Sequence, residues 1–428
     1  MENQSDGGVG LLHGRTQMLI IGLNRAQNGA AMFGHADFAF GQYRRQASGN
    51  FRLILWCRNH CNPVRRKLCA GRVGHPACGS KVITFAVAKA GIFAYVFEQC
   101  LSLILAFVFF PLPLRAEHSS YQYFRIGHES DAQTKPSPGY ALMGGGKDLD
   151  DAFRWLCAKA NGGDFLVIRA ADDDDYNAYV NRSCRLNSVA TLIIPSREGA
   201  EDPAAGEIIR RAEAVFIAGG DQAHYLRAWQ HTAVAEALNE GIASGKPIGG
   251  TSAGLAVLGE FVYGALNDPP DGMLASPEAL KDPFTSQVTL VRDFLTIPLL
   301  RDTITDSHFA KRDRLGRSLV FLARLMQDGW SKTPREIAVD ERSAVLVEGD
   351  GKATVVGSGK GAYFIRPVQP PALCKKGLPL TFVEISTYKA PTGSHFDLSS
   401  WSGEGGTGFT LAVRDGIVSS TQTGGALY

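Results

Sequence analysis

The chain has 428 residues, of which 45% are hydrophobic and 20% are charged, a composition typical of globular proteins. This length allows two or three domains and a sizeable core. The formal net charge of +2 gives no support for a nucleic-acid or acidic-membrane partner.

Four of the cysteines gather early in the chain, at Cys57, Cys61, Cys69 and Cys78. Their C-x3-C-x7-C-x8-C spacing matches no common zinc finger or ribbon, so we expect no metal site and no cofactor. Residues 1–92 show no sustained hydrophobic period of two or 3.6, which predicts a non-native or disordered extension.

An apolar run, CLSLILAFVFFP at residues 100–111, precedes the stretch LPLRAEHSS. The run is too short to span a bilayer comfortably, and it fits the apolar region of a signal peptide over 93–116, cleaved after Ala116. A buried core segment and a membrane anchor are the alternatives. A signal peptide predicts a periplasmic or secreted protein that begins near Glu117 and meets the membrane only through the signal segment.

From about Pro138 onward, apolar segments alternate with segments of helical spacing. The apolar segments lack polar alternation, which is typical of strands buried on both faces of a parallel sheet. We predict strands at 139–146, 164–171, 189–195, 214–220 and 246–254, each running into a turn, and helices at 148–160 and 232–245. Asp148 and Asp150 are expected to cap the first of these helices. The predicted fold class is therefore α/β, with helices on both faces of the sheet.

Three glycine-containing turns, 144–146, 219–222 and 250–254, follow predicted strands, at the sheet edge where α/β proteins bind ligands. The acidic run 172–175 is expected to be a solvated loop or a helix start. Cys157 and Cys184 either pair in an oxidising compartment, which leaves Cys374 unpaired, or remain buried thiols. The tail from 367 to 428 contains strand-like runs and predicts a small C-terminal β extension.

The segment Gly250-Thr251-Ser252-Ala253-Gly254 matches G-x-S-x-G, the spacing of a nucleophile elbow. Small neighbours allow a sharp strand-to-helix turn that leaves the hydroxyl of Ser252 exposed. The following segment, AGLAVLGEFVYG, is expected to be a helix whose first amides favour a developing oxyanion.

A serine nucleophile needs a base, and His308 is the candidate because it lies at a predicted strand-to-helix junction. Arg312, Arg314 and Arg317 follow it in the next helical segment. These arginines are either solvated helix charges or a clamp for an anion or a peptide carboxylate.

Four motifs in order, FIAGGDQ, GGTSAG, DSHFAKRDRLGR and IAVDERSAVLVEGDG, closely resemble the cyanophycinase and dipeptidase E family of serine peptidases, peptidase family S51. The resemblance covers roughly residues 138–366, and we assign 117–366 to the catalytic domain. It implies a three-layer sandwich with a mostly parallel sheet, similar to class I glutamine amidotransferases and flavodoxin. It also implies a serine-type exopeptidase or isopeptidase, with a homodimer as a candidate assembly.

The same resemblance assigns roles to single residues. It implies Ser252 as the nucleophile, His308 as the base, and the amides of Gly220 and Ala253 as the oxyanion hole. For the acidic third member we favour Glu278, with Asp268, Asp271 and Glu341 as alternatives. The residues that match the substrate-pocket pattern of the family are Gln222, Asp306, Arg312, Arg314 and Arg317.

The implied substrates are acidic or β-aspartyl peptides, cleaved through an acyl-enzyme on Ser252. Cyanophycin itself is in doubt, because Ser307 stands where cyanophycinases carry glutamine immediately before the histidine. Two rival interpretations are an α/β-hydrolase esterase, which shares G-x-S-x-G, and a degenerate family member that only binds peptides.

Overall fold

The computed structural model describes residues 120–269 and 272–428 in full, and the backbone of five short strands nearer the N-terminus. The chain divides into the units Met1–Leu114 and Arg115–Tyr428. In the first unit, β1 (Asp37–Phe40) pairs with β4 (Leu55–Arg58), and β3 (Phe51–Leu53) pairs with β2 (Arg44–Arg45) and β5 (Ile83–Thr84). The signal-like segment 93–116 and the side chains of the early cysteine cluster lie outside the described residues.

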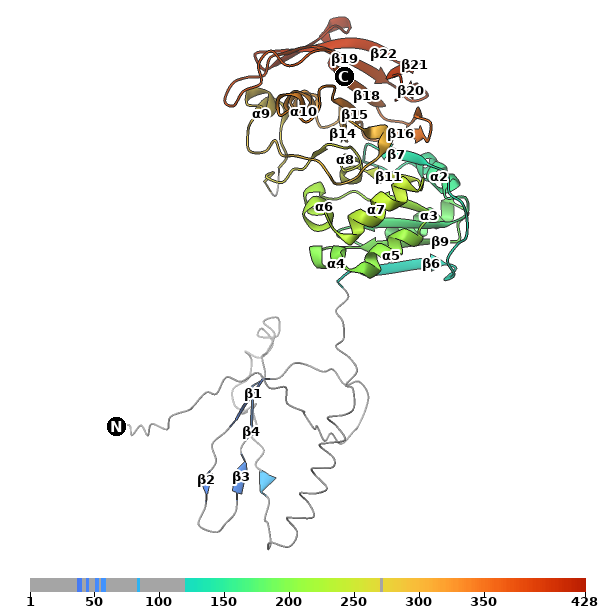
Figure 1. Cartoon of the computed structure of the whole chain (residues 1–428), viewed down its shortest axis with the longest axis vertical. Coiled ribbons are helices and arrows are strands. Elements are labelled where there is room, and N and C mark those ends of the chain that lie inside the picture. Colours follow the sequence, from blue (N-terminus) through green and yellow to red (C-terminus); the bar gives the residue numbers. More distant parts are fainter. Residues whose placement is uncertain are drawn as a thin grey trace, which may run out of the picture. The chain divides into compact units, whose positions relative to one another are not determined.

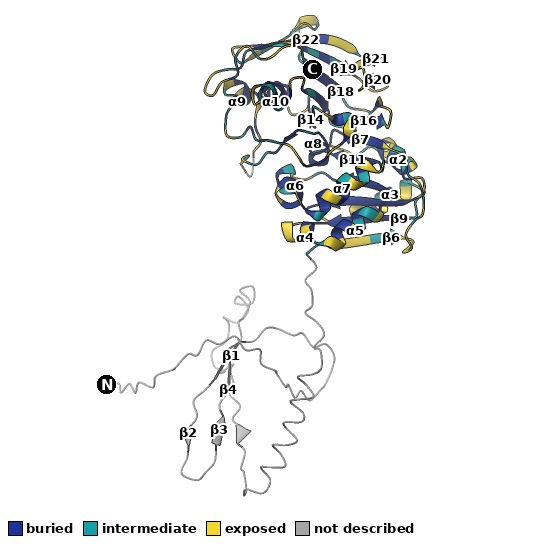
Figure 2. Cartoon of the chain, in the orientation of Figure 1, coloured by how far each residue is buried: buried dark blue, intermediate teal, exposed yellow. Residues whose placement is uncertain are grey.

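Arg115–Tyr428 is built around a ten-stranded sheet of order β21-β20-β17-β16-β7-β11-β10-β8-β9-β6 (Figure 1). Its centre consists of five parallel strands: β7 (Gly139–Met143), β8 (Asp164–Arg169), β9 (Ser188–Ile193), β10 (Ala214–Ile217) and β11 (Ile248–Thr251). All residues of these strands are buried, as the absence of polar alternation predicted (Figure 2). The run β9-β8-β10-β11 has the flavodoxin-like order 2-1-3-4, so the predicted α/β class is confirmed.

Antiparallel strands flank this parallel centre on both sides. On one side lies β6 (Gln122–Gly127), and on the other lie β16 (Ser343–Glu348), β17 (Lys352–Gly357), β20 (His395–Asp397) and β21 (Ser402–Glu404). The first helices after β7 and β8, α2 (Asp150–Lys159) and α3 (Asp175–Ser183), share one apolar cluster with alternate residues of the parallel strands. The acidic run thus becomes a loop that enters α3, as expected.

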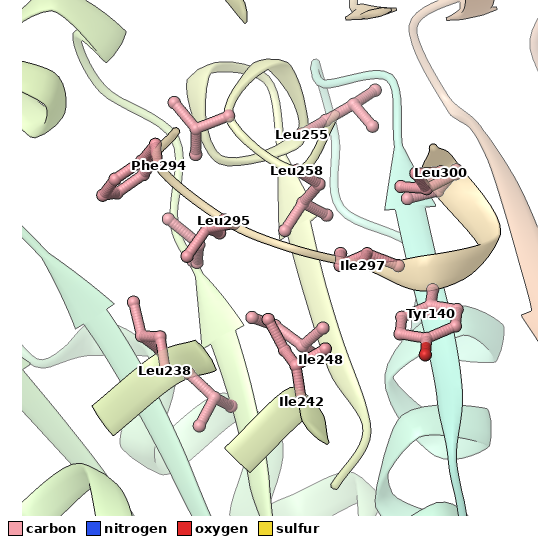
Figure 3. Packing of buried hydrophobic residues seen from close by; sticks show 14 of the residues in the cluster. Tyr140, Leu238, Ile242, Ile248, Leu255, Leu258, Phe294, Leu295, Ile297 and Leu300 are labelled. Atoms are coloured by element: carbon pink, nitrogen blue, oxygen red, sulfur yellow. The ribbon is translucent and has the colours of Figure 1, made fainter. Parts of the chain in front are cut away.

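The opposite face of the sheet is covered by α5 (Pro203–Arg211), α6 (Gln222–Trp229) and α7 (Ala233–Ala243), with the short α4 (Arg197–Glu201) beside them. Figure 3 shows Leu238 and Ile242 of α7 in the same apolar cluster as Ile248 of β11, with Leu255 and Leu258 from beyond the strand. The sheet thus has one apolar layer and one set of helices on each of its faces. This is the three-layer sandwich that the family resemblance implied.

A second sheet has the order β14-β15-β18-β19-β22-β23. Its strands are β14 (Thr303–Asp306), β15 (Arg335–Val339), β18 (Ala362–Pro367), β19 (Phe382–Ala390), β22 (Thr407–Arg414) and β23 (Ile417–Ser420). It packs against α9 (Ser276–Lys281) and α10 (Leu315–Gln327) through its own apolar cluster. Within the tail 367–428, β20 pairs with β17 and β19 pairs with β18, so the tail adds strands to both sheets.

Two helix predictions need correction. Leu149, not Asp148, is the N-cap of α2, and no side chain caps this helix, because Asp148 accepts a hydrogen bond from Tyr176 instead. The helix after Ser252 is only one turn, α8 (Ala253–Ala256), since the chain bends to bring Phe261 beside Ile304 of β14. It continues into β12 (Val262–Tyr263), which pairs with β13 (Leu290–Val291).

Cys157 of α2 and Cys184 at the end of α3 form a disulfide, and Cys374 is a buried free thiol. One of the two cysteine alternatives is thereby confirmed. Among the residues that the structure describes, no helix combines the length and apolar character needed to cross a membrane.

Candidate active site

Ser252 lies on a sharp turn between β11 and α8, at the carboxyl edge of the parallel strands. Its φ of 54° and ψ of −114° are unusual for a residue with a side chain, and such strain is typical of functional turns. The turn requires small residues next to Ser252. At Gly254, for example, a Cβ would lie 2.0 Å from the carbonyl oxygen of Ile217. The geometry is therefore that of a nucleophile elbow.

His308 follows β14 and brings its ring to the serine. The Nε2 atom lies 2.7 Å from the Oγ atom of Ser252, and the side chain is 6% exposed. The backbone N–H of His308 donates to the carbonyl oxygen of Gly144, which fixes where the ring enters the site. The structure thus brings together the two residues that the sequence paired as nucleophile and base.

Gly145 allows this close approach. A Cβ at Gly145 would lie 2.5 Å from the Cε1 and Nε2 atoms of His308, and its φ of +90° also favours glycine. The carbonyl oxygen of Gly145 accepts a hydrogen bond from the N–H of Arg342, which follows Glu341. The turn after β7 therefore contacts both the histidine segment and the 340–342 turn, a role that the sequence analysis missed.

The carboxylate partner of His308 is Glu341. Its Oε1 atom lies 2.7 Å from the Nδ1 atom of His308, so Ser252, His308 and Glu341 form a hydrogen-bonded chain. Glu278, which we favoured from the sequence, is exposed on α9 and is not the carboxylate that contacts His308. The alternative Asp268 accepts a hydrogen bond from Tyr263, and Asp271 lies outside the described residues.

Burial and neighbouring charges shift the pKa values of His308 and Glu341. Burial lowers the pKa of His308, Arg312 and Arg314 lower it further, and the hydrogen bond to Glu341 partly opposes them. The hydrogen bond from His308 holds the pKa of Glu341 below its usual value. At neutral pH the pair therefore consists of a neutral imidazole and a carboxylate, which are the states that a general base and its orienting group require.

Gly220 and Ala253 are the residues whose amides the family resemblance assigns to the oxyanion hole. Ala253 is the first residue of α8, so its N–H has no partner within the helix. Gly220 follows β10 with a φ of +154°, and a Cβ added to the preceding Gly219 would lie 3.5 Å from the Cβ atom of Ser252. Within the described residues, neither amide donates to another backbone carbonyl.

Three residues expected in the substrate pocket form a buried ionic cluster instead. Asp306 is 3% exposed and accepts hydrogen bonds from Arg314 at 3.0 Å and from Arg317 at 2.7 Å. Burial alone would raise the pKa of Asp306, but the two guanidinium groups outweigh it and hold the pKa low. These contacts anchor the end of β14, two residues before His308, so a positioning role fits this cluster better than a free binding site.

Arg312 and Gln222 remain accessible. The side chain of Arg312 is 40% exposed, and its Nε atom lies 3.9 Å from Glu341. Gln222 is half-buried at the start of α6, directly beyond the Gly219–Gly220 turn, and within the described residues its side chain makes no hydrogen bond. Both remain candidates for contact with a substrate.

A pocket of about 300 Å³ opens beside the turn 144–148. Its lining residues are Lys147, Asp148, Asp150, Asp175, Tyr176 and Tyr179. Among the described residues, no group of three or more histidine, cysteine, aspartate or glutamate side chains could hold a metal ion.

The hydrogen-bonded chain Ser252–His308–Glu341 lies at the carboxyl edge of the parallel sheet, where α/β proteins bind their ligands. The model of peptidase family S51 matches residues 141–281 of the chain. The matched range contains Ser252, whereas His308 and Glu341 lie beyond it.

Two cyanophycinases are among the similar curated proteins. The one from Synechococcus elongatus is 30% identical over 181 residues, which cover 42% of this chain and 49% of the relative. The one from Geminocystis herdmanii is 26% identical over 222 residues, covering 50% of this chain and 73% of the relative. The chain thus spans about half the length of the first of these relatives.

A peptidase from an acI-B1 actinobacterium is a similar solved structure. It is 17% identical, covers 61% of this chain and 97% of its own, and superposes with a TM-score of 0.39.

Proposed function

We propose that this chain is a serine-type peptidase that hydrolyses acidic or β-aspartyl peptides through an acyl-enzyme on Ser252. The observation that carries the proposal is the hydrogen-bonded chain from Ser252 through His308 to Glu341. The match to the peptidase family supports it independently.

In this mechanism, the Nε2 atom of His308 takes the proton of Ser252 while Oγ attacks the scissile carbonyl carbon. The carbonyl oxygen becomes an oxyanion and accepts hydrogen bonds from the amides of Gly220 and Ala253. His308 then protonates the leaving amine, and the C–N bond breaks. A water molecule, deprotonated by His308, hydrolyses the ester and regenerates Ser252.

Glu341 accepts a hydrogen bond from the Nδ1 atom of His308, which keeps Nε2 free to accept the serine proton. It also stabilises the imidazolium that forms during the attack. Glu341 therefore replaces Glu278 as our candidate for the third member.

The preference for acidic substrates rests on charge. Arg312 exposes a guanidinium group beside Glu341, whereas Arg314 and Arg317 are buried and paired with Asp306. We assign the contact with a carboxylate of the substrate to Arg312, with Gln222 as a second polar contact.

We also propose that the enzyme acts in the periplasm or outside the cell. The disulfide between Cys157 and Cys184 supports an oxidising compartment. N-terminal sequencing of the mature protein from the producing cells tests this, with a start near Glu117 expected. A mature protein that still carries residues 93–116 would overturn the export proposal.

The function is tested by incubating the chain and its Ser252→Ala variant with β-Asp-Arg dipeptide, cyanophycin and a panel of Asp-X peptides. Mass spectrometry should find products for the wild type alone, and the preferred peptide defines the substrate class. Equal cleavage by the Ser252→Ala variant would contradict the proposal.

A further inference from the structure

The side chain of Tyr428 lies against the chain segment 308–315, which we call the histidine turn because it begins at the base and ends at α10. The Tyr428 hydroxyl donates a hydrogen bond to the Oδ1 atom of Asp313 at 2.7 Å, and its oxygen accepts one from the N–H of Leu315 at 2.9 Å. The Tyr428 ring packs edge to face against the ring of Phe309, with centroids 5.6 Å apart. Tyr428 therefore contacts both ends of the histidine turn.

The Tyr428 hydroxyl caps the start of α10. The N-cap residue of this helix is Arg314, whose side chain makes no capping hydrogen bond, and Leu315 is the first helical residue. The first N–H groups of a helix have no partner within the helix and need one from outside it. Leu315 is buried, so the Tyr428 oxygen satisfies an N–H that little water can reach.

Asp313, just before α10, is held from two sides. Its carboxylate accepts the hydrogen bond from Tyr428, and its backbone carbonyl oxygen accepts one from the hydroxyl of Ser276 at the start of α9. Burial raises the pKa of Tyr428, and the hydrogen bond to Asp313 adds to this, while the N–H of Leu315 opposes it. The Tyr428 hydroxyl therefore keeps its proton at neutral pH and continues to donate to Asp313.

The backbone of the histidine turn needs such support. His308 has a φ of 47° and Asp313 a φ of 48°, in the left-handed region that residues with a side chain seldom adopt. A backbone of this kind persists where surrounding contacts hold it. The N–H of Arg312 donates to the carbonyl oxygen of His308 at 2.9 Å, so a tight turn links the base to Asp313. A shift at Asp313 is therefore passed on to the backbone of His308.

We propose that Tyr428 is a positioning residue for His308: through its hydroxyl it braces the histidine turn so that the imidazole meets Ser252. The proposal rests on the proposed serine-peptidase function and gives the extension 367–428 a role in it. Because Tyr428 acts through the turn and not on the substrate, its loss should lower the rate of the chemical step and leave substrate binding unchanged.

The test uses the full chain and the variants Tyr428→Phe and Tyr428→Ala. The first removes the hydroxyl with both of its hydrogen bonds, and the second also removes the ring that contacts Phe309. Tyr388→Phe is the matched control, because the Tyr388 hydroxyl on β19 likewise accepts a backbone N–H, that of Gly406 at 2.7 Å.

The rate and the final extent of Ser252 labelling by a fluorophosphonate are measured for each protein. Steady-state kinetics with the preferred peptide of the panel give kcat and KM. Tyr428→Phe is also combined with His308→Ala, because a residue that acts through the base should have no effect once the base is absent.

We expect Tyr428→Phe to lower the labelling rate and kcat by on the order of tenfold, and Tyr428→Ala to lower them further, with KM unchanged. The final extent of labelling should equal that of the wild type, which shows that the variants are folded. Tyr428→Phe should cause no further loss in the His308→Ala protein, and Tyr388→Phe should retain the wild-type rates.

A wild-type labelling rate in Tyr428→Phe would overturn the proposal, as would a change confined to KM or to the final extent of labelling. A further loss from Tyr428→Phe in the His308→Ala protein would also overturn it, because Tyr428 would then act by another route. Failure of the wild type to label at Ser252 would overturn the proposed function itself. That outcome is recognised separately, because it appears in the wild-type protein before any variant is compared.

Discussion

The Nε2 atom of His308 lies 2.7 Å from the Oγ atom of Ser252, although 56 residues separate them in the chain. Two different sheets supply these residues, since Ser252 follows β11 of the ten-stranded sheet and His308 follows β14 of the six-stranded sheet. Met143, the last residue of β7, accepts a hydrogen bond from the N–H of Ser252, and the turn that follows β7 contacts His308, so the site depends on how this end of β7 packs.

Replacing Glu341 by glutamine should lower kcat by roughly 100- to 10,000-fold, because the amide no longer fixes the tautomer of His308 or stabilises its charged form. KM should change little, since Glu341 acts through His308. Steady-state kinetics with the preferred peptide measure both constants. Glu278→Gln is the control, and a larger loss of kcat in Glu278→Gln than in Glu341→Gln would contradict this assignment.

The acid limb of the pH–rate profile should have its midpoint below 6.5. His308 must be neutral to accept the serine proton, and its burial and the nearby arginines lower its pKa from that ordinary value. Arg312→Gln removes one of these positive charges and should move the midpoint to higher pH. Glu341→Gln removes the group that raises the pKa and should move it to lower pH. Profiles of kcat/KM give the midpoints, and a wild-type midpoint above 6.5 contradicts the account.

Replacing Asp306 by asparagine should lower the free energy of unfolding by about 3–5 kcal/mol, because two buried guanidinium groups lose their counter-ion. Arg312→Gln should leave stability nearly unchanged and raise KM instead, because its side chain is partly exposed and faces the site. Denaturant unfolding and steady-state kinetics separate the two effects. A stable Asp306→Asn protein with a raised KM would restore Asp306 as a substrate contact.

Glu336 is fully buried on β15, and neither of its carboxylate oxygens has a hydrogen-bond partner among the described residues. Burial, with a smaller contribution from Asp306, raises its pKa from 4.5 to about 8. Between these values the folded state keeps a proton that the unfolded state releases, so the free energy of unfolding falls as the pH rises through this interval.

Glu336→Gln should therefore gain stability relative to the wild type as the pH rises from about 4.5 to about 8. Melting temperatures measured across this interval test the expectation, with the exposed Glu198→Gln as the control. A stability difference that is constant across the interval would show that Glu336 does not carry this pH dependence.

Much of the architecture could be predicted because it depends on local patterns. Apolar runs such as 165–168 predicted a parallel sheet, and the glycine at each side of Ser252 predicted the elbow. The order of motifs also placed His308 correctly opposite Ser252.

The remainder depends on contacts between distant segments. Glu341 contacts His308 only because the turn after β15 packs beside Gly145 and Gly146, which no local pattern around Glu278 or Glu341 reveals. Asp306 forms ion pairs with both Arg314 and Arg317, and a helical spacing of arginines gives no sign of whether they face solvent or a buried carboxylate.

The most direct test of the account locates a covalent adduct. The chain is treated with a fluorophosphonate and digested, and the modified residue is identified by tandem mass spectrometry in the wild type and in His308→Ala. The account predicts a single adduct on Ser252 in the wild type and labelling at least 100-fold slower in His308→Ala. An adduct on another residue, or equal labelling of both proteins, would contradict the assignment of Ser252 as a nucleophile activated by His308.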